Sequence, residues 1–287
     1  MTAHHALTLA APAKINLFLH VTGRRDDGYH SLESVFVPIS LADTVALTLR
    51  HDGEIRLLNP PPGLTNTTDL ACRAARALQA VTRTGLGVDI ELFKRIPQGA
   101  GLGGGSADAA STLLGLNRLW RLNLSRGELH RVAATLGADV PFFVFGRPAL
   151  AHGIGEQLRA VSLPTLHLVV ASPGVAVATA AVFSHPNLTR DTLPQLTPVF
   201  ALDFGRNDLQ TVAEALAPEI SQLAQDFVNA GAAPRMTGSG SCVFALTSSA
   251  TAASHLCRDL QSRGRPAWAV RTLRHHPLYS FVSDAII

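Results

Sequence analysis

The sequence of 287 residues has few cysteines and no pattern that would join them. Its three cysteines, Cys72, Cys242 and Cys257, are odd in number and lie far apart. Because no Cys-x-x-Cys pair or Cys/His cluster is present, neither a disulfide framework nor a zinc site is expected. Reduced, buried thiols are expected instead, as is typical of a cytoplasmic protein.

Long apolar runs and long basic runs are missing as well. No apolar stretch reaches the roughly 18 residues of a membrane-spanning helix. The N-terminal segment has no basic start, and Lys14 interrupts its apolar residues, so a secretory signal peptide is not expected. The formal net charge is only +3, and no Lys/Arg run could follow a nucleic-acid backbone. We therefore expect a cytoplasmic protein that binds neither membranes nor nucleic acid.

The sequence does contain ample material for a folded core. Hydrophobic residues make up 47% of the chain and charged residues 16%, which is not the composition of a disordered protein. Strand and helix patterns alternate up to about residue 160 and then start again. The sequence thus predicts an α+β protein with two domains, residues 1–160 and 161–287.

Local patterns predict the main elements. Strands are expected at 14–23, 87–96, 167–174, 242–248 and 267–273, and helices at 69–81, 106–120, 207–231 and 252–264. Two alternating runs around Asp52-Gly53 predict a β-hairpin. Ser106 is expected to be the N-cap of helix 106–120, and Ser125 and Glu128 to form the capping box of a further helix. Residues 137–146, which include a proline, are expected to be irregular.

Five glycines lie between Gly99 and Gly105, directly after a predicted strand. Such a loop lets backbone N–H groups approach an anion closely. It matches Gly-x-Gly-x-x-Gly, but a dinucleotide site also needs a βαβ unit and an acidic residue about 20 positions later. Here a second helix follows, without that acid. The Walker loop fails for lack of a lysine, and the protein-kinase loop for lack of its partner motifs.

With Pro97 in front and a small-residue helix behind, this loop resembles the phosphate-binding motif of the GHMP kinase superfamily. Residues 11–36 and 235–246 resemble the other two motifs of that superfamily. The resemblance implies a ribosomal-protein-S5-domain-2-like ATP-binding domain over 1–160 and a ferredoxin-like (α/β plait) domain over 161–287. It also implies ATP, accompanied by Mg²⁺, with no separate metal site of the protein. The residues implied in nucleotide binding are Pro97, Gln98, Gly99, Ala100, Gly101, Leu102, Gly103, Gly104, Gly105, Ser106 and Ala107.

Within the superfamily, the segments 12–30 and 137–143 resemble kinases whose alcohol substrate carries a cytidine diphosphate group. The resemblance implies that Asp139 accepts the hydroxyl proton and that Lys14 lowers the pKa of the hydroxyl or stabilises the developing charge. Aromatic side chains would stack on the base. The implied substrate contacts are Asn16, Tyr29, His30, Thr179 and Phe183.

Two carboxylates depart from the pattern of the relatives, because Asp69 and Asp108 stand where some relatives have asparagine. A carboxylate beside phosphates is unfavourable, so Asp108 is expected to point away from them. Homoserine kinase, mevalonate kinase and a non-catalytic nucleotide-binding relative stay open as alternatives. Tyr29 and His30 argue against the first two, and the catalytic residues against the third. Both a monomer and a homodimer stay open.

Overall fold

The first half of the chain builds a six-stranded mixed sheet. The computed structural model describes residues 5–194 and 205–283. The sheet has the order β3-β4-β2-β5-β6, and β1 pairs with β2. Its strands are β1 (Ala6–Arg24), β2 (His30–Arg50), β3 (Ile55–Leu57), β4 (Gly87–Phe93), β5 (Ala149–His152) and β6 (Gln157–Ala160).

The two longest strands carry irregularities where the site will form. The antiparallel pairing of β1 with β2 shifts register between Pro12 and Lys14 and again between Asn16 and Leu19. Such bulges bend a strand and redirect its side chains. Lys14 and Asn16 are therefore presented by distorted backbone within an otherwise buried strand.

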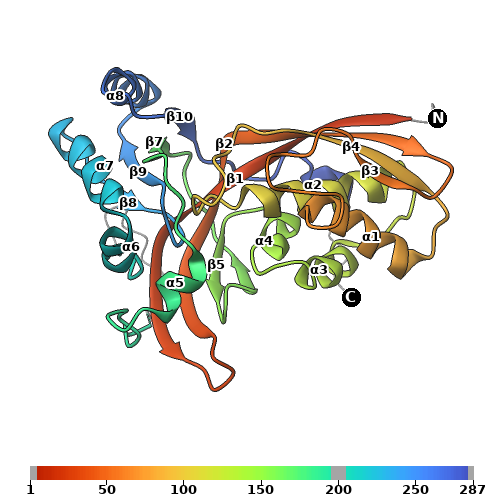
Figure 1. The fold of residues 1–287 in the computed structure, drawn as a ribbon, viewed down its shortest axis with the longest axis horizontal. Coiled ribbons are helices and arrows are strands. Elements are labelled where there is room, and N and C mark those ends of the chain that lie inside the picture. Colours follow the sequence, from red (N-terminus) through yellow and green to blue (C-terminus); the bar gives the residue numbers. More distant parts are fainter. Residues whose placement is uncertain (1–4, 195–204, 284–287) are drawn as a thin grey trace.

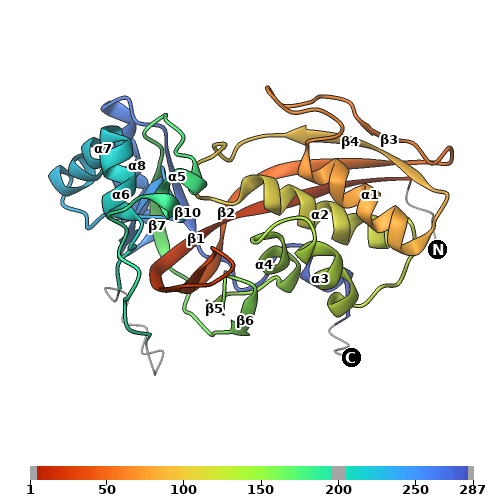
Figure 2. The ribbon, with the colours of Figure 1, turned by 60° about the horizontal axis from the view of Figure 1, so that its bottom comes forward.

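Four helices cover one face of this sheet (Figure 2). Their apolar faces bury a core with β1, β2 and β4, in which small residues such as Ala71, Ala75 and Ala110 let helices and sheet approach closely. These helices are α1 (Leu70–Thr82), α2 (Gly104–Leu119), α3 (Arg126–Ala134) and α4 (Val140–Phe145). The short α4 is held between α2 and α3.

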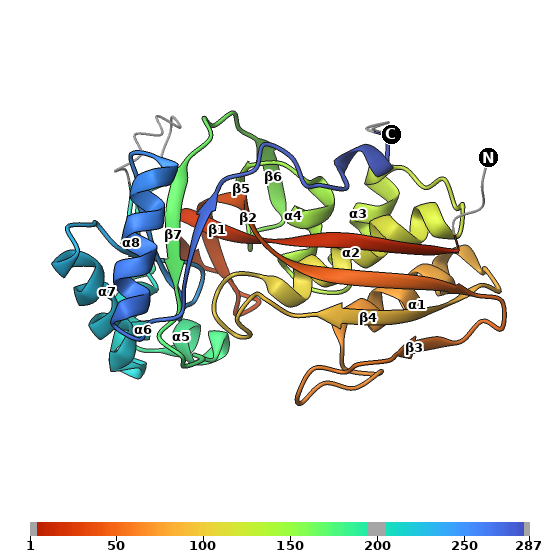
Figure 3. The same ribbon diagram turned by 90° about the horizontal axis from the view of Figure 1, so that it is seen from above.

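The second half builds an antiparallel four-stranded sheet with the order β10-β7-β9-β8. Figures 1 and 3 show its helices gathered at the opposite end of the molecule from α1–α3. The strands are β7 (His167–Ala171), β8 (Arg235–Met236), β9 (Val243–Thr247) and β10 (Ala267–Arg271). The helices are α5 (Thr179–Ser184), α6 (Gln210–Leu216), α7 (Pro218–Asn229) and α8 (Ala250–Ser262), and a 3₁₀ turn follows at Tyr279–Phe281.

The predicted α+β architecture is confirmed, and the division at residue 160 stays a prediction. Each half of the chain contributes residues to the hydrophobic core of the other half. Leu19 and Val21 of β1 lie in the core of the second half, while Leu278 and Val282 return to the core of the first. Arg126 anchors this returning segment by donating to the carbonyl oxygens of Tyr279 and Val282 at 2.7 and 3.1 Å.

Most predicted elements are present, and three local predictions are wrong. The hairpin at Asp52-Gly53 does not form, because β3 pairs in parallel with β4. Residues 140–145 are helical, with Pro141 in the first turn where its missing N–H costs nothing. Ser106 is not an N-cap, since α2 begins at Gly104 and Gly103 occupies the cap position. The Ser125–Glu128 capping box is confirmed.

None of the described helices combines the length and the apolar composition needed to cross a membrane. The cytoplasmic location and the oligomeric state stay predictions. The segment 186–198 is rich in proline and threonine, which predicts a loop, and part of it lies outside the described residues.

Candidate active site

A cleft of about 620 Å³ opens where the two halves of the chain meet around the glycine loop. Most of the residues predicted for nucleotide binding line it, as do both predicted catalytic residues. Leu102 and Ala107 are buried in the hydrophobic cores and do not line the cleft. The predicted residues that line it are Lys14, Asn16, Pro97, Gln98, Gly99, Ala100, Gly101, Gly103, Gly104, Gly105, Ser106, Asp139, Thr179 and Phe183.

The glycine loop has the backbone of an anion cradle. Gly99, Gly101 and Gly103 have φ values of +63°, +75° and +71°, which residues other than glycine rarely adopt. Gly103 is the N-cap of α2 and has no side chain to satisfy the first amides. The N–H groups at the start of α2 therefore lack helical acceptors and, with the helix dipole, favour a bound anion.

Two other segments of the sequence pack against this loop. The N–H of Lys14 donates to the carbonyl oxygen of Leu102 at 3.0 Å, and the N–H of Cys242 donates to that of Ala100 at 3.2 Å. A side chain on Gly101 would place its Cβ 2.2 Å from the carbonyl oxygen of Thr237. The three motifs, which lie far apart in the sequence, therefore form one packed structure.

Because Gly101 combines a left-handed backbone with this close approach, Gly101→Ala should lower the free energy of unfolding by more than about 2 kcal/mol. Gly63 has a similar φ of +78° but open space around its Cβ position. Gly63→Ala should therefore cost only about 1 kcal/mol. Urea unfolding of both variants measures the difference. Equal losses would show that the contact with the Thr237 carbonyl contributes nothing.

Asn16, one of the lining residues of the cleft, connects the first and third motifs. Its Oδ1 accepts from Lys14 Nζ at 2.8 Å and from the N–H of Gly238 at 3.0 Å. Its Nδ2 donates to Ser34 Oγ at 2.8 Å, and its own N–H donates to Thr237 Oγ1 at 3.0 Å. The role of Asn16 as a substrate contact stays a prediction. In the structure its side chain holds the Lys14 ammonium in place.

Lys14 and Asp139 face each other across the floor of the cleft. Lys14 Nζ lies 3.7 Å from Asp139 Oδ2 and 5.2 Å from the centre of the Phe36 ring. The lysine side chain is 4% exposed and the aspartate 34%. Asp139 precedes α4 but makes no side-chain cap, so its carboxylate stays available to a ligand. A buried ammonium beside an accessible carboxylate is suited to moving a proton next to developing negative charge.

A second cavity, of about 650 Å³, continues from the cleft. The two share Leu32, Ala138, Ile154, Thr179 and Phe183 as lining residues. The rings of His30 and Phe183 are stacked with centres 5.2 Å apart, and Tyr29 is 61% exposed at the edge. Thr179 Oγ1 lies 2.7 Å from Ser239 Oγ. Of the residues predicted to contact the substrate, Tyr29, His30, Thr179 and Phe183 line this second cavity, whereas Asn16 lines only the cleft.

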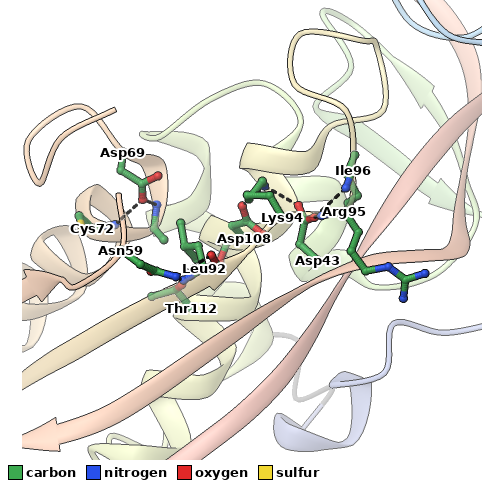
Figure 4. Close-up of polar contacts among 11 residues, drawn as sticks. Asp43, Asn59, Asp69, Cys72, Leu92, Lys94, Arg95, Ile96, Asp108 and Thr112 are labelled. Carbon is green, nitrogen blue, oxygen red and sulfur yellow. Dashed lines mark hydrogen bonds and ion pairs between the residues drawn. The ribbon is translucent and has the colours of Figure 1, made fainter. Parts of the chain in front are cut away.

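The sequence did not predict a cluster of charges formed by Lys94, Asp43 and Asp108 (Figure 4), in which Lys94 and Asp108 line the cleft and Asp43 is buried. Lys94 Nζ bonds to both carboxylates. Asp43 also accepts from the N–H of Ile96 at 2.8 Å. Asp108 is 3% exposed, and its Oδ1 has no hydrogen-bond partner among the described residues. Asp108 lines the cleft. The positive charge of Lys94 offsets its carboxylate, and the sequence did not predict this pairing.

Burial raises the pKa of the Asp108 carboxyl to about 7, against the lowering effect of Lys94 and with a further increase from Asp43. The folded protein therefore keeps a proton that the unfolded chain loses above about pH 4. This contribution stabilises the fold fully at low pH and is lost as the pH rises through about 7, at a slope of at most about 1.4 kcal/mol per pH unit.

Asp108→Asn should remove this slope. The free energy of unfolding of the variant, minus that of the wild type, should increase from about pH 5 to about pH 7. Urea unfolding across this range checks it, with the exposed Asp259→Asn as the control whose difference stays constant. Parallel curves for Asp108→Asn and the wild type would contradict a raised pKa.

Comparison with known proteins agrees with this geometry. The N-terminal domain model of the GHMP kinases matches residues 69–147, and their C-terminal domain model matches residues 197–266. These matches contain the glycine loop, Asp139 and the Thr237 segment. The chain belongs to the GHMP kinase family, so it is an ATP-dependent small-molecule kinase, and the predicted resemblance is confirmed.

Within that family, the chain is similar over nearly its whole length to 4-diphosphocytidyl-2-C-methyl-D-erythritol kinases. The enzyme of Burkholderia thailandensis is 50% identical over 283 residues, which cover 95% of this chain and 96% of that protein. That of Burkholderia mallei is 48% identical over the same shares. A crystal structure of 4-(cytidine 5'-diphospho)-2C-methyl-D-erythritol kinase superposes with a TM-score of 0.81 at 37% identity, covering 93% of this chain and 99% of that one.

Kinases of lower sequence identity have the same fold. A homoserine kinase from Cytophaga hutchinsonii superposes with a TM-score of 0.64 at 17% identity, and covers 96% of this chain and 97% of its own. A mevalonate kinase has a TM-score of 0.67 at 15% identity, with 94% and 100% covered.

Proposed function

We propose that this chain transfers the γ-phosphoryl group of ATP to the 2-hydroxyl of 4-diphosphocytidyl-2-C-methyl-D-erythritol. The products are the 2-phosphate and ADP, and the reaction belongs to the non-mevalonate route to isoprenoid precursors. One observation carries the proposal. The Lys14–Asp139 pair, 3.7 Å apart, lines a cleft that holds an anion-binding glycine loop and continues into a cavity with stacked rings.

The nucleotide phosphates would bind at the glycine loop, where the N-terminus of α2 offers free N–H groups. The acceptor hydroxyl would enter from the second cavity and meet the γ-phosphoryl group at Asp139. As the new O–P bond forms and the bond to ADP breaks, Asp139 accepts the hydroxyl proton. Lys14 stabilises the negative charge on the transferred group and the attacking oxygen. Its hydrogen bond to Asn16 keeps the ammonium directed into the cleft.

The cytosine would bind in the second cavity. Phe183 offers a ring face, and Tyr29, exposed at the edge, can close on the other side of the base. His30 contributes a polar ring nitrogen beside Phe183. Thr179 lines both the cleft and this cavity, so it is placed to contact the part of the substrate between the base and the hydroxyl.

Magnesium would accompany the nucleotide and neutralise charge on its phosphates. Across residues 5–194 and 205–283, no group of three His, Cys, Asp or Glu residues is placed to bind a metal. The donor set fits an ion held mainly by phosphates and water, with the Ser106 hydroxyl at the start of α2 as the protein oxygen beside them.

An assay of ADP release tests the proposal directly. The protein is supplied with ATP, Mg²⁺ and one of three alcohols: the cytidylated methylerythritol, homoserine or mevalonate. We expect turnover with the first alone, because the other two have no base to fill the cavity that contains His30 and Phe183. Preference for homoserine or mevalonate would refute the assignment, and ATP binding without turnover of any alcohol would favour a non-catalytic relative.

A further inference from the structure

Arg190 lies behind His30, in the segment that follows α5. Its Nε donates to Nε2 of His30 at 3.0 Å. The other two nitrogens of the guanidinium donate to the carbonyl oxygens of Leu188 at 3.0 Å, Phe183 at 3.1 Å and His185 at 2.8 Å. All three nitrogens are therefore occupied, and the guanidinium is fixed between the end of α5 and the imidazole of His30.

This arrangement determines the protonation of His30. An arginine side chain has only donors and does not lose its proton in proteins. The Nε2 atom that accepts from Arg190 must therefore carry a lone pair. Protonation of that atom would turn one N–H toward another and bring two positive charges into contact. Burial lowers the pKa of His30, and the positive charges of Arg190 and Arg24 lower it further. The geometry therefore assigns the proton of the neutral imidazole to Nδ1.

We infer that Arg190 is a positioning residue for base recognition, which holds His30 in the tautomer that presents an Nδ1–H donor to the substrate. The inference rests on the proposed function. Nδ1 has no hydrogen-bond partner among residues 5–194 and 205–283, and His30 lines the cavity proposed for the base.

The tautomer decides which part of a pyrimidine edge His30 reads. Cytosine has two acceptors, O2 and N3, and one donor, the 4-amino group. An Nδ1–H donor pairs with one of the acceptors. The opposite tautomer would present a lone pair at Nδ1 and would fit only the amino group. Arg190 also holds the carbonyl oxygen of Phe183, so the same guanidinium positions the ring that stacks beside His30.

The tautomer can be observed in the free protein by ¹⁵N NMR of the imidazole nitrogens, with His30→Gln used to assign the signals. In the wild type we expect the shift of a protonated nitrogen at Nδ1 and of a lone-pair nitrogen at Nε2. In Arg190→Met both shifts should move toward the average expected for exchange between the two tautomers, or toward the values of the opposite tautomer. If this variant does not fold, Arg190→Lys, which keeps the charge but not the fork of donors, takes its place. Unchanged shifts in the variant would overturn the inference.

Kinetics test the consequence for recognition. Arg190→Met should raise KM for the cytidylated substrate by about tenfold or more, the loss of one well-placed hydrogen bond, and by more than it lowers kcat. KM for ATP should stay unchanged. In a His30→Ala background the same substitution should add less than about threefold. A full, additive effect in that background, or an equal rise of KM for ATP, would overturn the inference. Wild-type turnover of a different alcohol would refute the proposed function and leave the NMR result standing.

Discussion

Asp139→Asn should lower turnover by about 10²- to 10⁴-fold, because the amide cannot accept the hydroxyl proton. The substitution preserves size and leaves the start of α4 intact, since the Asp139 side chain makes no cap. ATP should still bind, as the glycine loop and the α2 N-terminus are unchanged. Steady-state ADP release and a calorimetric titration with ATP measure the two properties on one sample.

Asp259→Asn is the matched control for this substitution. Its carboxylate pairs with Arg263 at 2.9 Å on α8, outside the cleft, so turnover should stay within about twofold of the wild type. An Asp139→Asn variant with undiminished turnover would remove this carboxylate from the role of base. A parallel loss of ATP affinity and turnover would assign it to nucleotide binding instead.

The glycine loop shows why a motif can point to a candidate site from the sequence alone. Its positive φ angles and its contact with the Thr237 carbonyl demand glycine at fixed positions, so these demands can be read from the sequence alone. Lys14 and Asp139 were assigned by resemblance, because the segments 12–30 and 137–143 match motifs of the kinase superfamily. Both line the cleft in the structure.

Predictions from local patterns failed where distant segments compete. The runs around Asp52-Gly53 have the alternation of a hairpin, but β4 already occupies that edge of β2, from Thr44–Phe93 to Arg50–Gly87. The strand at Ile55–Leu57 pairs with β4 instead. Similarly, residues 140–145 lack the polar positions of a surface helix because α4 is almost wholly buried between its neighbours. Neither fact is visible in a local window.

The charge cluster was missed for a related reason, because Asp43 comes from β2, Lys94 from the residue after β4, and Asp108 from α2. One signal in the sequence points to it. The chain has two lysines, Lys14 and Lys94, among its basic residues, and both line the cleft. A lysine in an arginine-rich sequence marks a place where a compact ammonium suits the geometry better than a guanidinium.

Lys94→Met should lower the free energy of unfolding by about 3–5 kcal/mol, because it leaves two buried carboxylates without their shared cation. Asp43 and Asp108 have carboxylate side chains that are 0% and 4% exposed, so water cannot replace the ammonium. The backbone N–H groups of Arg95 and Ile96 would still stabilise Asp43, and the cost falls chiefly on Asp108. Urea unfolding at about pH 8, above the pKa of Asp108 in the wild type, measures the loss.

A second substitution separates the lost charge from the lost packing. If repulsion and desolvation of Asp108 cause the loss, Lys94→Met combined with Asp108→Asn should recover a large part of it, because one carboxylate then remains with its backbone donors. The single variant should also regain stability as the pH falls, since protonation of Asp108 has the same effect as the second substitution. A loss that is equal at about pH 5 and pH 8, and unaffected by Asp108→Asn, would assign it to the packing of the Lys94 methylenes.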